Sequence, residues 1–458
     1  MKKVYYLFSI LFLFILVSCL GHQPNVSEKK QYVVNTQVVH PDWTENAVIY
    51  EVNIRQYTEE GTFSAFIDHI PRLKDLGVDI LWIMPIHPIG EKNRKGSLGS
   101  YYSVKDYYSV NPEFGSMKDF RDLVKEAHAY GMYVIIDWVA NHTAWDNTWV
   151  IKHPQWYKKD SLGNIMSPFN WTDVVQLDYN NQELRKEMLN ALKYWVQNAD
   201  IDGFRCDVAG LVPCDFWTQA RMELDEIKPV FMLAEDESNY CLMEKAFDMN
   251  YAWELHHIMN NIARNENTVN DLRDYYSRMD SLFDPNIFRM NFITNHDENS
   301  WNGSEFERLG EAVEVFAMLT FTLPGMPLLY TGQEIGMNKR LEFFEKDKVE
   351  WENNRWERFY TNMIEMKKEH SVFWNGAAGS SFKMLPVPDS VNVVAFERSN
   401  DDETFVILAN LGSEKTEMKM DKSFANRQFF DLFSEDEVIF SKSMKLKGYE
   451  YKILMEDF

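Results

Sequence analysis

The sequence predicts an α/β protein built on a parallel (β/α)8 TIM barrel, with a small domain inserted after strand 3 and a C-terminal antiparallel β-sandwich domain. Strand-like apolar stretches alternate with amphipathic helical stretches eight times between residues 47 and 370. The first two helical stretches stop at Gly77 and Gly131, a common way for a helix to end. Beyond about residue 372 only short strands follow, which is typical of an antiparallel β domain.

The expected elements give the domain boundaries. Strands are expected at 47–54, 79–85, 132–139, 202–209, 230–235, 247–251, 288–295 and 327–332. Helices are expected at 63–76, 117–130, 182–198, 215–227, 311–323 and 358–370, with further helical material over 254–282. The tryptophan-rich stretch 141–180 lacks helical periodicity and interrupts the alternation. The barrel is therefore expected over 43–372, with 141–180 as its inserted domain, and the β domain over 373–458.

The N-terminus is predicted to be a targeting segment. Two lysines precede an apolar run over residues 4–17, which is too short to span a membrane comfortably. The run ends in Leu-Val-Ser-Cys at Cys19, which resembles a bacterial lipobox. Residues 1–19 are thus predicted to be a lipoprotein signal peptide, with Cys19 lipidated and 20–42 acting as a tether. The alternative is an ordinary signal peptide with an incidental cysteine. Either predicts export, and lipidation predicts an anchor to a bacterial membrane, periplasmic or at the cell surface.

Composition narrows the function classes. The formal net charge of −23 argues against a nucleic-acid partner, whose phosphates such a surface would repel. No Gly-rich dinucleotide or phosphate-binding motif is present in the sequence, so no nucleotide cofactor is expected. After Cys19, cysteines remain only at 206, 214 and 241. Three is an odd number without paired spacing, so no disulfide framework is expected, and Cys206 is interpreted as a small core residue.

Polar side chains recur where the predicted barrel strands end. They are Asp137, Asn141 and His142 after the third strand, Arg205 and Asp207 on the fourth, Glu235 on the fifth, and Asn295, His296 and Asp297 on the seventh. Active sites of (β/α)8 barrels lie at this end of the strands. Because each buried carboxylate carries a desolvation cost, their recurrence indicates a functional site.

Converging carboxylates without a phosphate-binding loop or a cysteine nucleophile suit glycoside hydrolysis. A retaining glycosidase needs one ionised carboxylate as nucleophile and one protonated carboxyl as general acid. Asp207 is the better nucleophile, because Arg205 on the same strand face would keep it ionised. Glu235, in an apolar setting, suits the acid/base role, and Asp297 could hold sugar hydroxyls. A metallohydrolase is the weaker alternative, since no His-x-His or His-x-x-x-His spacing occurs at a strand end.

These residues carry a resemblance to the alpha-amylase family, glycoside hydrolase family 13. Four blocks match in order and separation: Asp-Trp-Val-Ala-Asn-His at 137–142, Gly-Phe-Arg-Cys-Asp at 203–207, Leu-Ala-Glu at 233–235 and Phe-Ile-Thr-Asn-His-Asp at 292–297. The resemblance implies that the insertion is domain B and the β tail domain C. It implies the following roles: Asp207 nucleophile, Glu235 acid/base, Asp297 third essential carboxylate, His142, Arg205 and His296 around the sugar at the cleaved bond, and Tyr102 stacked on it.

Two departures from the family pattern concern the acceptor sugars and calcium. Many members carry Lys and His three and four residues after the nucleophile, where this chain has Gly210 and Leu211. Asn141 matches a calcium ligand of domain B, but the Asp-rich calcium loop after the first strand is replaced by Tyr-Thr-Glu-Glu-Gly at 57–61, so calcium stays open.

The predicted function is retaining hydrolysis of α-1,4-linked glucans or maltooligosaccharides. An α-glucan transglycosylase shares the covalent intermediate and remains an alternative. A non-catalytic glycan-binding lipoprotein is a further alternative from another class, although such proteins typically lose the carboxylates that this chain retains.

Overall fold

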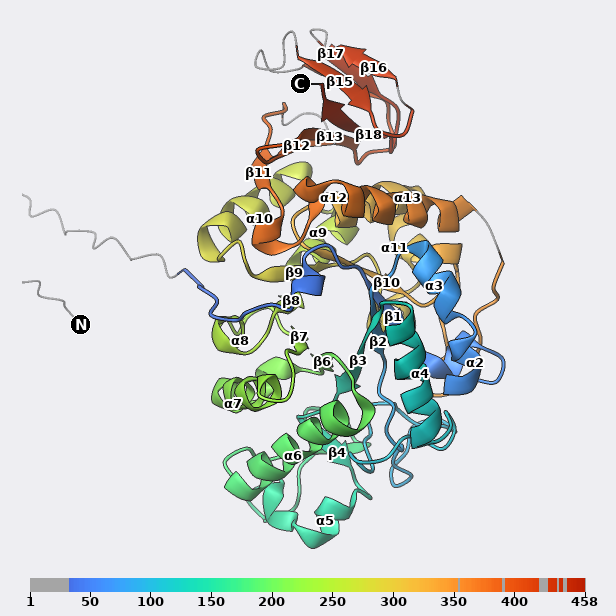
Figure 1. Cartoon of the computed structure of the whole chain (residues 1–458), viewed down its shortest axis with the longest axis vertical. Helices are drawn as coiled ribbons and strands as arrows, with labels where there is room; N and C mark the ends of the chain where they lie inside the picture. The colour runs from blue at the N-terminus through green and yellow to red at the C-terminus, as the bar shows by residue number, and fades with distance from the viewer. Residues whose placement is uncertain are drawn as a thin grey trace, which may run out of the picture. The chain divides into compact units, whose positions relative to one another are not determined.

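Eight parallel strands close into a barrel in this computed structural model, which describes residues 33–352, 355–388, 392–419, 427–434, 436–439 and 443–457 (Figure 1). Cys19 and the predicted signal peptide lie outside the described residues. Around the barrel the order is β1-β10-β9-β8-β7-β6-β3-β2. The strands are β1 Ile49–Val52, β2 Ile80–Ile83, β3 Tyr133–Trp138, β6 Gly203–Cys206, β7 Phe231–Ala234, β8 Met249–Tyr251, β9 Phe288–Asn291 and β10 Met326–Tyr330. The predicted barrel is confirmed, strand for strand.

Alternate residues of each strand face opposite sides, and both sides are buried. One set, including Ile49, Trp82 and Phe231, packs inside the barrel, while residues such as Tyr50, Leu81 and Phe204 pack outward under the helices. The seventh strand is shorter than expected. It ends at Asn291; residues 292–295 form a loop, and His296 and Asp297 begin the helical turn that continues into the π-helix η4 Glu298–Asn302.

The helices cover the outside of the barrel. The longer ones are α4 Met117–Ala129, α6 Gln182–Ala199, α7 Cys214–Asp225, α9 Trp253–Ala263, α10 Val269–Leu282, α12 Val313–Thr322 and α13 Arg355–Glu369. The expected helix over 63–76 is two helices, α2 Phe63–Ile67 and α3 Ile70–Leu76. Pro71 lies in the first turn of α3, where its missing N–H costs nothing, and it starts a new helix there.

The segment inserted after β3 is a small hairpin with packed aromatic rings. Strand β4 His142–Ala144 pairs antiparallel with β5 Val174–Gln176, and the short helix α5 Thr148–Lys152 lies between them in the chain. Trp149 and Trp156 are buried with rings 5.3 Å apart, so these two tryptophans form the packing of the insertion.

The C-terminal strands form the expected antiparallel domain. Six strands pair in the order β11-β12-β13-β18-β15-β16, and β14 pairs with β17. Their bounds are β11 Ser381–Met384, β12 Val393–Ser399, β13 Thr404–Asn410, β14 Thr416–Lys419, β15 Gln428–Asp431, β16 Glu437–Ile439, β17 Ser443–Leu446 and β18 Tyr451–Glu456. Arg398 of β12 donates to the carbonyl of Thr322 at the end of α12, which joins this domain to the barrel. Within the described ranges, no helix is long and apolar enough to cross a membrane.

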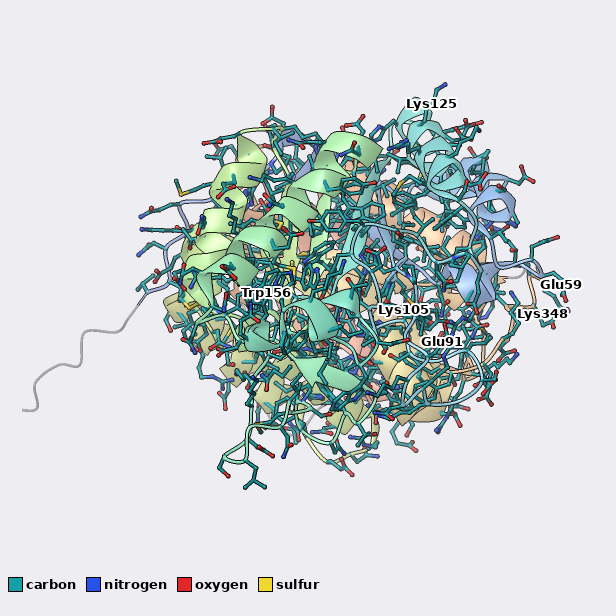
Figure 2. All side chains as sticks on the ribbon, turned by 90° about the horizontal axis from the view of Figure 1, so that it is seen from below. Glu59, Glu91, Lys105, Lys125, Trp156 and Lys348 are labelled. Atoms are coloured by element: carbon teal, nitrogen blue, oxygen red, sulfur yellow. A yellow bond between two sulfur atoms is a disulfide. The ribbon has the colours of Figure 1, made fainter. Side chains whose placement is uncertain are left out.

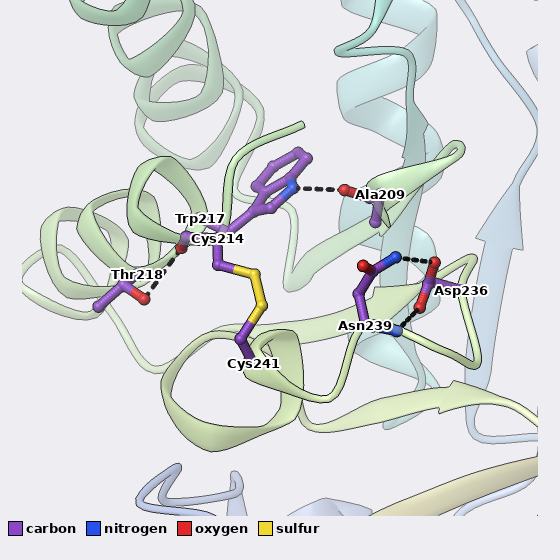
Figure 3. The surroundings of a disulfide bond; sticks show 7 residues. All are labelled: Ala209, Cys214, Trp217, Thr218, Asp236, Asn239 and Cys241. Atoms are coloured by element: carbon purple, nitrogen blue, oxygen red, sulfur yellow. Dashed lines mark hydrogen bonds between the residues drawn. A yellow bond between two sulfur atoms is a disulfide. The ribbon is translucent and has the colours of Figure 1, made fainter. Parts of the chain in front are cut away.

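The expectation that the cysteines form no disulfide is wrong. Cys214, at the start of α7, is bonded to Cys241, at the start of the short helix α8 Cys241–Lys245 (Figure 3). Their Cα atoms lie 6.1 Å apart across 27 residues of sequence. The odd number of cysteines gave the wrong expectation, because one of the three, Cys206, is a buried free thiol and the other two form a pair. The interpretation of Cys206 as a core residue is confirmed. The bond ties the loop after β6 to the loop after β7.

Candidate active site

The carboxyl ends of the barrel strands bring most of the predicted site residues to one pocket of about 250 Å³. Tyr102, His142, Asp207, Glu235, His296 and Asp297 all line it. Arg205 lies fully buried beneath the carboxylates. Asn141 does not line the pocket.

The backbone of β6 delivers Asp207 to the pocket through two unusual positions. Gly203 has no room for a side chain, because a Cβ there would lie 1.8 Å from the carbonyl oxygen of Phe231 on β7. Immediately after Asp207, Val208 adopts φ 37° and ψ 48°, a left-handed conformation that is unfavourable for a β-branched residue. This turn directs the Val208 N–H at Oε2 of Glu235, 2.8 Å away, so strained backbone couples the two carboxylates.

Arg205 holds three carboxylates rather than one. Its Nη1 donates to Asp137 at 2.9 Å and to Asp207 at 3.1 Å. Its Nη2 lies 2.9 Å from Oε2 of Glu235. The expected apolar setting of Glu235 is therefore wrong, and Arg205 does not select Asp207 alone for ionisation. Its guanidinium contacts both pocket carboxyls with one shared positive charge.

Burial raises the pKa of both carboxyls. Burial, followed by the negative charge of Glu235, raises the pKa of Asp207 well above its ordinary value, and Arg205 opposes this rise. Burial also raises the pKa of Glu235, again against Arg205. Burial thus favours the protonated form of each carboxyl, and the Arg205 guanidinium favours the ionised form of each. One carboxylate and one acid is the protonation state that a retaining glycosidase requires.

A buried pair on β1 and the loop after β9 supplies a second cation. Nδ1 of His296 contacts Oε1 of Glu51, and its Nε2 lies 2.7 Å from the Tyr102 hydroxyl. Tyr102 in turn donates to Asp137 at 3.0 Å. Burial alone would lower the pKa of His296, but the carboxylates of Asp297 and Glu51 outweigh it and raise the pKa to about 9. His296 is therefore an imidazolium at neutral pH.

Sequence reasoning missed Glu51. Its carboxylate is fully buried, and it also accepts the backbone N–H of His296 at 3.2 Å. The available signal was a lone acid within the otherwise apolar first strand, Ile-Tyr-Glu-Val. A carboxylate in such a strand needs a charged partner, and this one faces a histidine predicted for the site.

His142 is the neutral counterpart of His296. Burial lowers the pKa of His142 to about 4, although Asp173 acts in the opposite direction. It begins β4 and lines the pocket close to Trp171, with ring centroids 5.5 Å apart. A neutral imidazole can accept or donate a hydrogen bond, which suits contact with a sugar hydroxyl.

The side chain of Asn141, which matches a calcium ligand of the family, contacts two neighbouring side chains. Its side chain is engaged by neighbours, with Oδ1 3.4 Å from Nε2 of Gln176 and Nδ2 3.2 Å from Nδ1 of His142. In the described part of the chain, no group of three or more His, Cys, Asp or Glu side chains could hold a metal ion. At the loop after β1, where the family's calcium loop is missing, Nζ of Lys346 donates to the carbonyls of Arg55 and Thr58.

Further pocket residues come from the loops around the strand ends and from the inserted segment. They are Lys95, Ser100, Trp171, Asp173, Val174, Val208, Trp301, Phe343 and Phe344. Nε1 of Trp301 donates to Asp297 at 3.1 Å, and its ring contacts that of Phe343 with centroids 5.0 Å apart. Aromatic faces suit the apolar faces of sugar rings. The only signal was the abundance of aromatic residues in these loops.

The space next to Gly210 explains one departure from the family pattern. A Cβ at Gly210 would lie 2.0 Å from Oδ2 of Asp236 and 2.3 Å from Nδ2 of Asn239. Asp236 accepts hydrogen bonds from both the backbone and the side-chain amide of Asn239 (Figure 3). A side chain at 210 would therefore displace the Asp236 and Asn239 side chains from this turn, which the Cys214–Cys241 bond flanks.

A (β/α)8 barrel with three carboxyl groups in an aromatic-walled pocket at the carboxyl ends of its strands is typical of a glycoside hydrolase. Comparison with known proteins agrees. The alpha-amylase catalytic-domain family model matches residues 41–175 and 169–411, and the model of the maltogenic amylase C-terminal domain matches 382–453. The chain belongs to the alpha-amylase family.

Three relatives illustrate the similarity. The crystal structure of a maltogenic alpha-amylase from Thermotoga neapolitana is 31% identical with a TM-score of 0.83, over 90% of this chain and 99% of that one. The maltogenic alpha-amylase of Bacillus acidopullulyticus is 26% identical over 86% of this chain and 70% of its own length. Alpha-amylase MalA of Haloarcula japonica is 27% identical over 82% of this chain, which spans 57% of the length of that relative.

Proposed function

We propose that this protein hydrolyses α-1,4-glucosidic bonds of starch-derived glucans or maltooligosaccharides with retention of configuration. The observation that carries the proposal is the pair Asp207 and Glu235, both contacted by the buried Arg205 at an aromatic-walled pocket. The matched family models and the names of the relatives, which include maltogenic alpha-amylases, support the substrate class.

The reaction follows from the roles of the pair. The Asp207 carboxylate attacks C1 of the donor sugar, and a bond forms between its oxygen and C1. The C1–O bond to the acceptor breaks as Glu235 gives its proton to the departing oxygen. Glu235, now a carboxylate, then removes a proton from water, which attacks C1 and releases Asp207. Each step inverts C1, so the configuration is retained overall.

The surrounding residues hold the donor sugar while charge develops on it. The Asp297 carboxylate, beside the His296 imidazolium at 3.5 Å, is placed to accept hydrogen bonds from sugar hydroxyls. The Tyr102 ring lies over the pocket floor, stacked 5.4 Å from His296, and offers a flat face to the sugar. Positions fixed in advance by such buried networks reduce the reorganisation required in the transition state.

Product analysis with maltoheptaose tests the proposal and its nearest alternative. Hydrolysis gives only products shorter than the substrate, with one new reducing end per bond cleaved. A transglycosylase would also give longer products, because a sugar replaces water in the second half-reaction. Asp207→Asn serves as the inactive control. Absence of any product from the wild-type protein would contradict a catalytic role and favour the glycan-binding alternative.

We further propose that the protein is exported and anchored to a bacterial membrane by a lipid on Cys19. The lipobox-like sequence supports this proposal, and so does the Cys214–Cys241 bond, because disulfides persist mainly in oxidising compartments. Metabolic labelling with a palmitate analogue should mark the wild-type protein and leave Cys19→Ala unlabelled in the soluble fraction. Equal membrane association of the two proteins would contradict the anchor.

A further inference from the structure

The order of strands in the barrel gives the direction in which a glucan must lie. Glu235 follows β7, which lies opposite β1, four strands away in either direction around the ring. The general acid must stand on the leaving-group side of the bond that breaks. The acceptor sugars therefore lie toward β7, and the donor sugar and anything attached to its non-reducing side point toward β1.

Two loops meet on that donor side. One follows β2 and the other follows β10, the two strands that flank β1. The N–H of Leu98 donates to the carbonyl of Phe344 at 3.1 Å. Both the N–H, at 2.8 Å, and the hydroxyl of Ser97 donate to the Glu345 carboxylate. We name residues 95–98 and 343–345 the end wall.

The contact between the two loops is close enough to exclude a sugar between them. Gly96 has φ 65°, and a Cβ there would lie 2.4 Å from Cβ of Phe344. Glycine is required at this position both for its left-handed backbone and for the approach of the facing loop. Lys95, Phe343 and Phe344 line the pocket, so the end wall is also the pocket's boundary.

The end wall is braced from below and from the side. Beneath it, Nη1 of the buried Arg55 donates to the carbonyls of Gly99 and Phe343, one from each loop. At its side, Nζ of Lys95 lies 2.8 Å from Oδ1 of Asp173 in the inserted segment. Two separate parts of the chain, Arg55 and the inserted segment, thus support the end wall, and neither contributes a proposed catalytic carboxyl to it.

We propose that the end wall closes the donor side of the cleft, so that the enzyme acts from the non-reducing ends of glucan chains. A cleft closed beyond the donor sugars accepts only a fixed number of units before the cleaved bond, whereas an open groove would accept an internal segment. The end wall therefore sets the product length. This inference rests on the proposed glucan hydrolysis and specifies its mode of attack.

A pair of maltoheptaosides labelled at the reducing end tests this mode. One is unmodified, and the other carries a 4,6-O-ethylidene group on its non-reducing glucose, which lengthens that end beyond what a closed pocket admits. We expect the wild-type enzyme to shorten the unmodified substrate in steps of uniform length. On the blocked substrate, kcat/KM should fall by about a hundredfold or more. Similar rates on both substrates, with products of mixed length, would contradict the proposal that the end wall closes the cleft. Failure to cleave either would overturn the proposed function itself.

Two variants test whether these residues close the cleft. The first is Ser97→Ala with Glu345→Ala, which removes the side-chain contacts across the wall. The second replaces residues 92–98 with a Gly-Gly link, which removes one loop of the wall. We compare kcat/KM on the blocked substrate with kcat/KM on the unmodified one. The ratio of the first to the second should rise about tenfold or more in the shortened-loop variant, and less in the double substitution. An unchanged ratio in a shortened-loop variant that still cleaves the unmodified substrate would overturn the assignment.

Glu59→Ala is the matched control. Glu59 forms an exposed ion pair with Lys348, which belongs to the same loop after β10 but lies outside the end wall (Figure 2). This variant should leave the substrate ratio at the wild-type value.

Discussion

Nδ1 of His296 and the carboxylate of Glu51 are in direct contact at the centre of the barrel, although 245 residues separate them in sequence. The contact keeps a positive charge beside Asp297 in a site dominated by carboxylates. Burial raises the pKa of Glu51, and the imidazolium opposes that rise. The pair is therefore a positioning element that neither residue could provide alone.

Replacing Glu51 should change how the protein responds to alkaline pH. The folded-state pKa of His296, about 9, exceeds the unfolded value near 6.5. The protonated His296 therefore stabilises the fold by about 3 kcal/mol at most. This contribution is complete below pH 6.5 and is lost as the pH rises through 9. In Glu51→Gln this loss, and the alkaline limb of kcat/KM, should move to lower pH, with about tenfold lower activity at neutral pH.

Urea unfolding and kcat/KM measured from pH 6 to pH 10 check this shift. Glu403→Gln is the matched control, because Glu403 contacts His370 at 2.8 Å away from the pocket. An alkaline limb that stays in place in Glu51→Gln would show that His296 does not depend on Glu51 for its charge.

The roles proposed for Asp207 and Glu235 can be distinguished with a substrate whose leaving group needs no proton. Glu235→Gln should lose about 10²–10⁴ in kcat/KM on maltooligosaccharides, because it cannot protonate the leaving oxygen. With maltosyl fluoride it should still form the glycosyl-enzyme and then accumulate it, because the base for the second step is missing. Asp207→Asn should form none. Intact-protein mass spectrometry would detect the added maltosyl group. Its appearance on Asp207→Asn would reverse the assigned roles.

Removal of the Cys214–Cys241 bond should destabilise the fold. A disulfide that closes 27 residues contributes about 3 kcal/mol by restricting the unfolded chain. The variant Cys214→Ser with Cys241→Ser should unfold at lower urea concentration than the oxidised wild type. A thiol reductant should lower the wild-type midpoint to the variant's value and leave the variant unchanged. Coincident curves for oxidised and reduced wild type would contradict a stabilising bond.

Calcium removal should leave the fold intact at the loop after β1. The Lys346 ammonium already donates to two backbone carbonyls there, so the loop has a cation of its own. A chelator is expected to change the melting temperature by less than about 2 °C, whereas Lys346→Ala should cost about 1–3 kcal/mol that calcium does not restore. Loss of stability in the chelator, reversed by added calcium, would contradict this expectation.

The strands and the carboxylates at their ends were predictable because each has a local signature. Buried parallel strands are continuous apolar runs, and an acid that ends such a run stands out. The end wall had no local signature, because the partners Ser97 and Glu345 are ordinary loop residues 248 positions apart. Gly96 and Gly210 look like common loop glycines in the sequence. Their need for close approach becomes visible only when the facing loop is in place.

The anomeric form of the first product tests the central claim most directly. If Asp207 forms a covalent intermediate and Glu235 acts as acid and then base, each half-reaction inverts C1. Proton NMR during the first minutes of maltoheptaose hydrolysis, before mutarotation, should therefore show the α-anomer of the newly formed reducing end. Initial appearance of the β-anomer would mean a single inverting displacement by water and would contradict the account.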